Sequence, residues 1–257
     1  MADRSEMKHK ILTETDLEYL FASKKRGVRF PLWAIYSVIF IASLVIIFTV
    51  ANFSSISQKI GYSFRNQDNS SETSDLPTIS NFGDDPVLTG SIPKLEENTI
   101  FIPKINVTAP ISWNVPNIPD KVSVGLEKGT IHLAGTALPG EVGNVFITGH
   151  SSDYLWAKGN YKSIFALMSE LVIGDQTYIR YANVTYIYKI KSKNTVKPDN
   201  LSVLKQGSDS TLTIMTCWPV GTSLYRMIDV ADQIYPNPKS NSNQDAESAP
   251  NTLPDIR

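Results

Sequence analysis

The stretch Thr211-Leu-Thr-Ile-Met-Thr-Cys-Trp-Pro-Val-Gly-Thr-Ser-Leu-Tyr-Arg226 contains the single cysteine of the chain, Cys217. Before the cysteine, leucine and isoleucine alternate with threonine and methionine, and this period of two predicts a half-buried strand. Pro219 has no N–H group and therefore ends the strand. A second β-prone run, residues 224–230, returns along the first. Cys217 is expected at a strand end, with Arg226 on the partner strand, where a guanidinium favours the thiolate.

Length and composition narrow the class of protein. The chain has 257 residues, 42% of them hydrophobic, and a net charge of −1, which leaves room for one or two domains with a sizeable core. A near-neutral charge lacks the basic footprint of a nucleic-acid-binding protein, so no nucleic-acid partner is expected. One cysteine excludes an internal disulfide and a cysteine-based metal cluster. By composition alone, a lone cysteine is most often a small buried hydrophobe rather than a reactive thiol.

An apolar segment near the N-terminus has the properties of a membrane span. Residues 31–53 form 23 positions without a charged side chain. At ~1.5 Å per residue, a helix of this length crosses a ~30 Å hydrocarbon core. Trp33 and Tyr36 lie near one end, where interfacial aromatic residues are common. A buried core helix rarely runs this long without a charge, and no small-x-small signal cleavage site follows. We therefore expect a transmembrane helix over residues 31–53.

The flanks of this segment predict the layout of the rest of the chain. Four Lys or Arg residues lie in residues 21–30, and only Lys59 and Arg65 lie in residues 51–65. Positive charge remains inside, so we expect a cytoplasmic N-terminal arm and an extracellular remainder in the cell membrane. By composition we divide the chain into an arm (1–30), a transmembrane helix (31–53), a flexible extracellular linker (54–98), an outer domain (99–235) and a disordered tail (236–257).

The sequence pattern of residues 99–235 indicates a mainly β domain. Short β-prone runs, including residues 122–126, alternate with proline and glycine turns. Residues 161–171 have helical spacing, with Ser163 as a candidate N-cap. Many short strands with one modest helix predict a closed or nearly closed β-barrel.

The chain offers three histidines that could assist a cysteine nucleophile. A free thiol with a pKa near ~8.5 is mostly protonated at neutral pH, and the group that takes its proton is usually a histidine. His9 precedes the apolar segment, and His132 lies within the apolar alternation of a strand, where a packed role is favoured. His150 follows a buried strand and begins a loop, so it is the better candidate. Without further context, His150 and Arg226 would be read as an ordinary loop histidine and a solvated strand residue.

The context comes from short motifs in a fixed order: Thr148-Gly-His-Ser151, Thr216-Cys-Trp-Pro219 and Arg226. Together they resemble the sortase family of membrane-anchored cysteine transpeptidases. The similarity covers residues 99–235 and continues through Gly129-Thr-Ile-His-Leu-Ala-Gly-Thr-Ala-Leu-Pro-Gly140, Gly143-Asn-Val-Phe-Ile147 and Gly174-Asp175.

The resemblance implies an eight-stranded sortase-type β-barrel with one or two short helices. It also implies that Cys217 attacks a peptide carbonyl in the C-terminal sorting signal of a surface protein and forms an acyl-thioester. His150 would protonate the leaving amine and later deprotonate the incoming amine of a cell-wall precursor or pilin. Arg226 would stabilise the oxyanion of the tetrahedral intermediate. Thr216 and Trp218 are expected at substrate-binding positions.

Two other readings remain open from the sequence. A barrel of this kind could only hydrolyse peptides, with water in place of the amine, or it could be a non-catalytic, membrane-tethered domain that binds a partner. Some sortases bind calcium through loop acids, but Glu127, Glu141 and Glu170 are scattered in the sequence. We therefore expect no metal and no cofactor.

Overall fold

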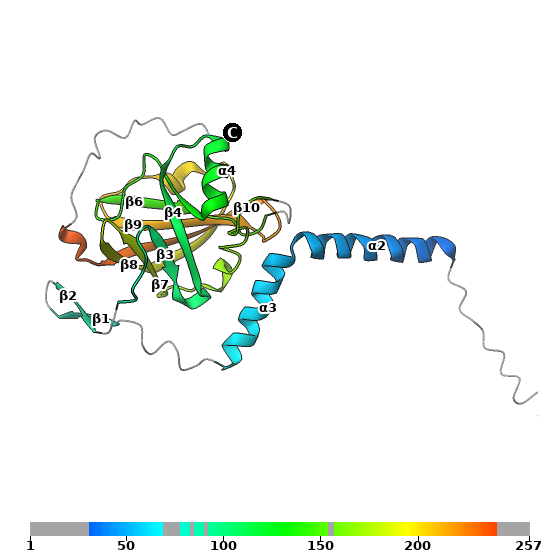
Figure 1. Ribbon diagram of the computed structural model, residues 1–257, viewed down its shortest axis with the longest axis horizontal. Coiled ribbons are helices and arrows are strands. Elements are labelled where there is room, and N and C mark those ends of the chain that lie inside the picture. Colours follow the sequence, from blue (N-terminus) through cyan, green and yellow to red (C-terminus); the bar gives the residue numbers. More distant parts are fainter. Residues whose placement is uncertain (1–30, 69–77, 83–84, 90–91, 154–156, 241–257) are drawn as a thin grey trace, which may run out of the picture. The chain divides into compact units, whose positions relative to one another are not determined.

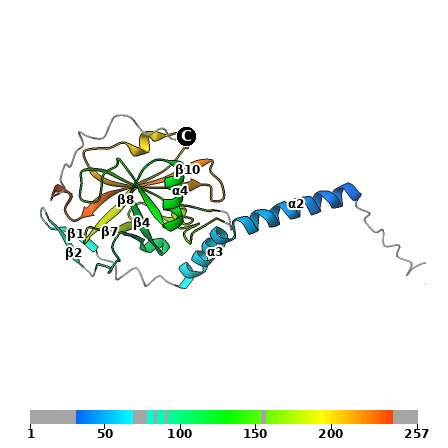
Figure 2. The same ribbon diagram turned by 45° about the horizontal axis from the view of Figure 1, so that its top comes forward.

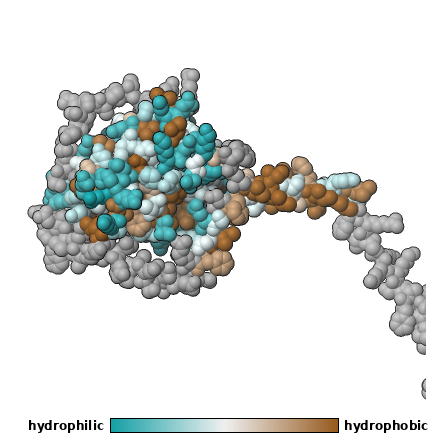
Figure 3. All heavy atoms as spheres, in the orientation of Figure 1, coloured by the Kyte–Doolittle hydropathy of each residue, from teal (hydrophilic) through white to brown (hydrophobic). Residues whose placement is uncertain are grey.

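The computed structural model describes residues 31–68, 78–82, 85–89, 92–153 and 157–240 (Figure 1). The chain divides into two compact units, residues 1–46 and residues 47–257. Helix α2 (Leu32–Ala51) is, within these described ranges, the one helix long and apolar enough to cross a membrane. Figure 3 shows it coloured as hydrophobic along most of its length. The apolar helix expected from the sequence is therefore present.

The second unit is built on a closed barrel. Among the described residues, eight strands form it, in the order β10-β8-β7-β3-β4-β5-β6-β9. Their bounds are β3 (Thr99–Ile102), β4 (Val107–Val115), β5 (Thr130–Leu133), β6 (Gly143–Thr148), β7 (Gln176–Tyr181), β8 (Val184–Val196), β9 (Ser210–Trp218) and β10 (Tyr225–Tyr235). The pairs β4–β5 and β6–β9 are parallel and the other neighbours are antiparallel. The predicted mainly β barrel is confirmed.

The barrel core explains the alternation of the opening stretch. Leu212 and Ile214 of β9 are fully buried in the main hydrophobic cluster. They pair in register with Val145 and Ile147 of β6, which are buried in the same cluster. Because successive strand side chains point to opposite faces, Cys217 lies on the face opposite to this core.

Residues 122–126, which we expected as a strand, belong instead to helix α4 (Pro119–Lys128). Pro119 suits the first helical turn, and Asp120 and Lys128 lie at the ends where their charges favour the helix dipole. The alternating valines of this segment have high β propensity, which misled the prediction. The helix packs against β4 and β5, and it lies beside β4 in the second view (Figure 2).

Residues 161–171 do not form the expected helix. They make successive turns and one short 3-10 helix, η3 (Met168–Glu170). Phe165, Leu167 and Met168 are all buried, so the segment packs on several sides rather than along one helical stripe. The Phe165 N–H donates to the carbonyl of His150 at 2.9 Å, so tertiary contacts replace the helical hydrogen bond. The remaining 3-10 helices are η2 (Pro103–Ile105), η4 (Leu201–Leu204) and η5 (Pro238–Ser240).

The predicted flexible linker, residues 54–98, is partly ordered. Helix α3 (Phe53–Asp68) occupies its start, and strands β1 (Thr78–Phe82) and β2 (Asp85–Thr89) form an antiparallel hairpin. Composition does not reveal the long-range contacts that hold this helix: Tyr62 is buried in the main core cluster, and Ser55 and Gln58 bond to the loop after β6. The predicted arm (1–30) and most of the tail (241–257) lie outside the described residues.

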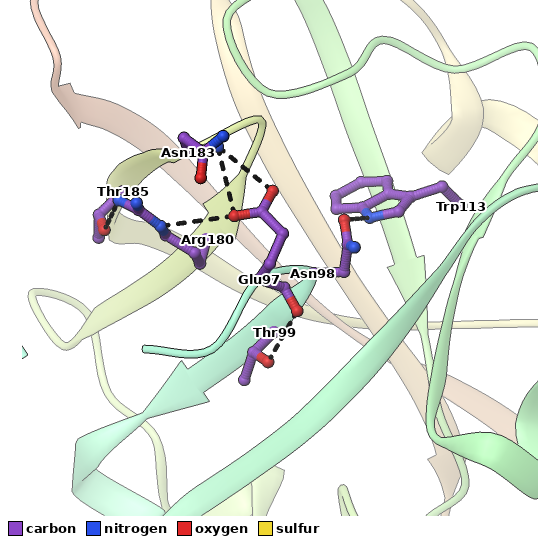
Figure 4. Close-up of polar contacts among 7 residues, drawn as sticks. All are labelled: Glu97, Asn98, Thr99, Trp113, Arg180, Asn183 and Thr185. Carbon is purple, nitrogen blue, oxygen red and sulfur yellow. Dashed lines mark hydrogen bonds and ion pairs between the residues drawn. The ribbon is translucent and has the colours of Figure 1, made fainter. Parts of the chain in front are cut away.

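The entry to the barrel is fixed by polar contacts just before β3 (Figure 4). The Glu97 carboxylate accepts the Asn183 N–H at 3.3 Å and lies 3.5 Å from Arg180 Nε. The Asn98 side-chain oxygen accepts the Trp113 indole N–H at 2.8 Å. These contacts tie residues 97 and 98, just before β3, to the β7–β8 hairpin and to β4.

Candidate active site

The parallel pairing of β6 and β9 brings His150 beside Cys217. Thr148 at the end of β6 pairs with Met215 on β9. His150 and Cys217 each lie two residues further along their own chain segments. Because the two strands run in the same direction, both residues emerge at the same edge of the barrel.

A hydrogen bond from the barrel interior fixes this edge. Thr216 is 2% exposed, and its hydroxyl donates to the Gly149 carbonyl at 2.8 Å. Gly149 has no space for a side chain, because a Cβ there would lie 2.7 Å from the Phe165 ring. The residues just before His150 and Cys217, Gly149 and Thr216, are therefore closely packed against each other, and Gly149 is also packed against Phe165.

Arg226 completes the site from the third strand. It is the direct cross-strand partner of Cys217 between β10 and β9, so the two side chains share a face. Its Nη1 donates to the carbonyls of Ser223 and Tyr225, each at 3.1 Å. These bonds hold the guanidinium beside the strand end that carries the thiol.

The three predicted catalytic residues line one cleft of about 250 Å³. Its other walls are mainly apolar and come from α4, β5, β6 and the segment around η4, with Leu126, Leu133, Phe146 and Val203 among them. The structure therefore gathers a thiol, an imidazole and a guanidinium in one apolar groove.

His150 is the basic group of this cleft. Burial lowers the pKa of His150, and the nearby Asp153 carboxylate, 3.6 Å from Nε2, raises this pKa in part. The lowered pKa favours the neutral imidazole at neutral pH, which is the form that can accept a proton from Cys217. Sequence reasoning did not single out Asp153. Its position three residues after a histidine at a strand end was the available signal.

Comparison with known proteins shows the family of this chain. The family model described as the Sortase domain matches residues 100–234, more than half of the chain. The chain belongs to the sortase family. It is 29% identical over 162 residues to Sortase SrtE1 of Streptomyces coelicolor, a match that covers 57% of this chain and 43% of that relative. The chain thus spans less than half the length of this curated relative.

Similar solved structures are also sortases. One is sortase C-1 from Actinomyces oris, with 28% identity, coverage of 53% of this chain and 72% of that chain, and a TM-score of 0.45. Another is the lid mutant of sortase A from Corynebacterium diphtheriae, with 27% identity, coverage of 55% and 71%, and a TM-score of 0.46. Sortase D5 from Clostridium perfringens has 30% identity, coverage of 53% and 77%, and a TM-score of 0.44.

In this sortase, Thr216 and Trp218 do not line the cleft, although the sequence suggested substrate-binding roles for both. Thr216 faces the barrel interior, as its hydrogen bond to Gly149 requires. Trp218 is half-buried and packs against the main core cluster, with Lys59 Nζ 5.5 Å from its ring centroid. Both residues therefore support the cleft from beside it.

His132 is a packed histidine, in agreement with the reading from its strand pattern. It is fully buried, and burial lowers the pKa of His132 to about 4. Its Nδ1 accepts the Asn114 N–H at 3.3 Å, and its Nε2 lies 2.9 Å from both Thr136 Oγ1 and the Ala137 carbonyl. These bonds hold the neutral ring between β4 and the loop after β5.

No metal site is formed by the residues that the structure describes. Within those ranges, no three His, Cys, Asp or Glu side chains converge closely enough to hold a metal ion.

Proposed function

We propose that this sortase is a cysteine transpeptidase that cleaves the C-terminal sorting signal of surface proteins and transfers the product to an amine acceptor of the cell wall or of a pilin. The observation that carries the proposal is the single cleft shared by Cys217, His150 and Arg226. The apolar side chains of the cleft suit an extended peptide with apolar residues before the cleaved bond.

The first half of the reaction forms a thioester. His150 accepts the proton of the Cys217 thiol, and the sulfur attacks the peptide carbonyl carbon. The guanidinium of Arg226 stabilises the negative oxygen that develops. The carbon–nitrogen bond then breaks as the imidazolium of His150 donates its proton to the departing amine.

The second half transfers the acyl group. The incoming amine attacks the thioester carbonyl, and His150 accepts the proton that the amine loses. The carbon–sulfur bond breaks, a new amide bond forms, and the proton returns to the sulfur of Cys217. A pre-oriented acid and base of this kind typically contributes ~10²–10⁴-fold to the rate.

The proposed location is the cell membrane, with α2 as a single-pass anchor. Helix α2 has the length and composition required for a span. The four Lys or Arg residues in residues 21–30 favour a cytoplasmic N-terminus. The barrel would then face the outside of the cell, where surface proteins carry their sorting signals.

The proposal is tested with the full-length chain, a peptide library and an added amine such as triglycine, with mass spectrometry of the products. We expect a peptide–triglycine conjugate with the wild type and none with Cys217→Ala. Hydrolysed product without conjugate would identify a peptidase instead. Full activity of Cys217→Ala would overturn the cysteine mechanism, and a wild type that cleaves no peptide would favour a partner-binding domain.

A further inference from the structure

Helix α3 packs against the loop that follows His150. Ser55 is 1% exposed, and its hydroxyl donates to the Ser151 carbonyl at 3.0 Å. Gln58 Nε2 donates to the Ser163 hydroxyl at 2.7 Å, further along the same loop. Two successive turns of α3 therefore hold the segment that carries the imidazole.

The same helix reaches the end of β9, which carries Cys217, and the loop that follows this strand. Lys59 Nζ lies over the ring of Trp218, the residue next to the nucleophile, at 5.5 Å from the centroid, within cation–π range. Asn52, just before α3, packs closely on Gly221, where an added Cβ would lie 2.5 Å from the Asn52 side-chain oxygen.

The two loops are also joined directly. The Gly221 N–H donates to the Ser152 hydroxyl at 2.8 Å. The β6–β9 ladder ends at Thr148 and Met215, before His150 and Cys217. Beyond this ladder, the His150 segment is held by the bonds from Thr216 to Gly149 and from Phe165 to His150, and Cys217 is held by its pairing with Arg226. The contacts of α3 and the bond between the loops add further restraints to both segments. Loops held by few contacts open more readily than strands, so these contacts bear on how well the two side chains are aligned.

We propose that Ser55 and Lys59 are positioning residues, through which α3 keeps the loop of His150 aligned with the end of β9 that carries Cys217, for proton transfer. The inference rests on the proposed transpeptidase function for its effect on turnover. The helix lies beside the barrel in both ribbon views (Figures 1 and 2). Its buried Tyr62 anchors it to the core independently of these two residues, so substitutions at Ser55 and Lys59 can loosen the loops without releasing the helix.

The first test uses iodoacetamide on the full-length chain in detergent micelles, because Cys217 is the only thiol in the sequence. We compare Ser55→Ala with Lys59→Met, the double variant and His150→Ala. Three charged side chains are described around the site: Asp153, Arg226 and Lys59. Asp153 and Arg226 are present in every variant, so Lys59 is the only one of these charges that is removed. We expect alkylation of the double variant at neutral pH to be about threefold slower or more, with a pH profile that approaches that of His150→Ala.

Matched controls separate positioning from general stability. Ser63→Ala removes a hydroxyl that donates to the Lys59 carbonyl within α3 at 3.0 Å, and it should leave the profile unchanged. Lys59→Arg retains a cation over the Trp218 ring, so Cys217 in this variant should be alkylated at the wild-type rate, unlike in Lys59→Met. Adding His150→Ala to the double variant should cause no further loss, because both act through the same pair. A profile equal to that of Ser63→Ala, or losses that simply add to those of His150→Ala, would overturn the inference.

The second test separates kcat from KM with a quenched fluorescent peptide selected from the library. We expect kcat of the double variant to fall about tenfold with KM nearly unchanged, since misplacement of reacting groups mainly slows the chemical step. An equal loss in a variant whose melting temperature has fallen below the assay temperature would indicate unfolding and count against positioning. The alkylation test needs no substrate, so it judges this inference even if the peptidase assay fails.

Discussion

Cys217 on β9 and Arg226 on β10 are direct cross-strand partners, so their side chains leave the barrel on the same face. This relationship places a positive charge beside the sulfur that we propose as the nucleophile. It is set by backbone register rather than by a flexible loop, which makes the guanidinium well placed for a charge that appears only during the reaction.

Arg226→Ala should lower kcat by ~10²–10³-fold, the usual effect of losing one donor to an oxyanion. Arg226→Lys should recover only part of the rate, because an ammonium cannot reproduce the planar fork of a guanidinium. Steady-state kinetics with the selected peptide measure both. Equal kcat for the wild type and Arg226→Ala would show that another group stabilises the oxyanion.

Asp153→Asn should shift the acidic limb of the pH dependence of kcat/KM to lower pH. The Asp153 carboxylate raises the pKa of His150 against the larger lowering effect of burial. Removing this charge lowers the pKa of His150 further, so the neutral base persists to lower pH. Asp209→Asn, in the loop between η4 and β9, is the matched control. A limb that stays in place in Asp153→Asn would show that the carboxylate does not act on this histidine.

Gly149→Ala should impair both folding and turnover. The added Cβ would lie 2.7 Å from the buried Phe165 ring, which cannot move without disturbing the core. Overpacking of this kind typically costs about 1–3 kcal/mol, and it displaces the residue next to His150. Gly207→Ala is the control, since the nearest atom to its added Cβ is 3.9 Å away. Thermal unfolding and kcat measured side by side should separate the two variants.

His132 should make the barrel less stable in acid. The pKa of His132 is about 4 in the folded chain because of burial, against an ordinary value of 6.5. The unfolded chain therefore binds more protons than the folded chain between pH 4 and pH 6.5. The stability that the neutral His132 contributes above pH 6.5 is lost as the pH falls toward 4. The loss amounts to about 3 kcal/mol. His132→Gln should flatten this part of the pH dependence in chemical denaturation, and an unaltered slope would contradict the assignment.

Asp229 should act in the opposite direction. It is fully buried on the inner side of β10, with Lys193 Nζ 3.0 Å and 3.2 Å from its two oxygens. Burial raises the pKa of Asp229 to about 6, against the partial lowering by Lys193. The folded chain thus binds more protons between pH 4 and 6, and this carboxyl costs stability as the pH rises through that window, by about 3 kcal/mol. Asp229→Asn should therefore steepen the loss of stability in acid, because the effect of His132 is no longer opposed. A slope equal to that of the wild type would refute this.

Local patterns were sufficient for the strand before Cys217, the apolar helix and the general β character of the domain. In each case, the pattern of neighbouring residues is enough to indicate the structure. Alternation of apolar and polar residues indicates a strand with one buried face, and a long run without charge indicates a segment in apolar surroundings. The same local reasoning failed for residues 122–126, where valine favours strands but packing on β4 and β5 supports a helix. It also failed for α3, which is held by Tyr62 and by partners about a hundred positions away.

By itself the sequence determined that this chain has one thiol, a histidine at the end of a strand and an arginine nine positions after the cysteine. Strands β9 and β10 are joined by a short turn, so the sequence of that turn was enough to predict that Arg226 lies on the strand beside Cys217. Only the tertiary structure decided that His150 joins them, because this depends on parallel pairing of β6 with β9 across 67 positions. Parallel neighbours are not joined by a tight turn, so their register is set by the packing of the whole barrel.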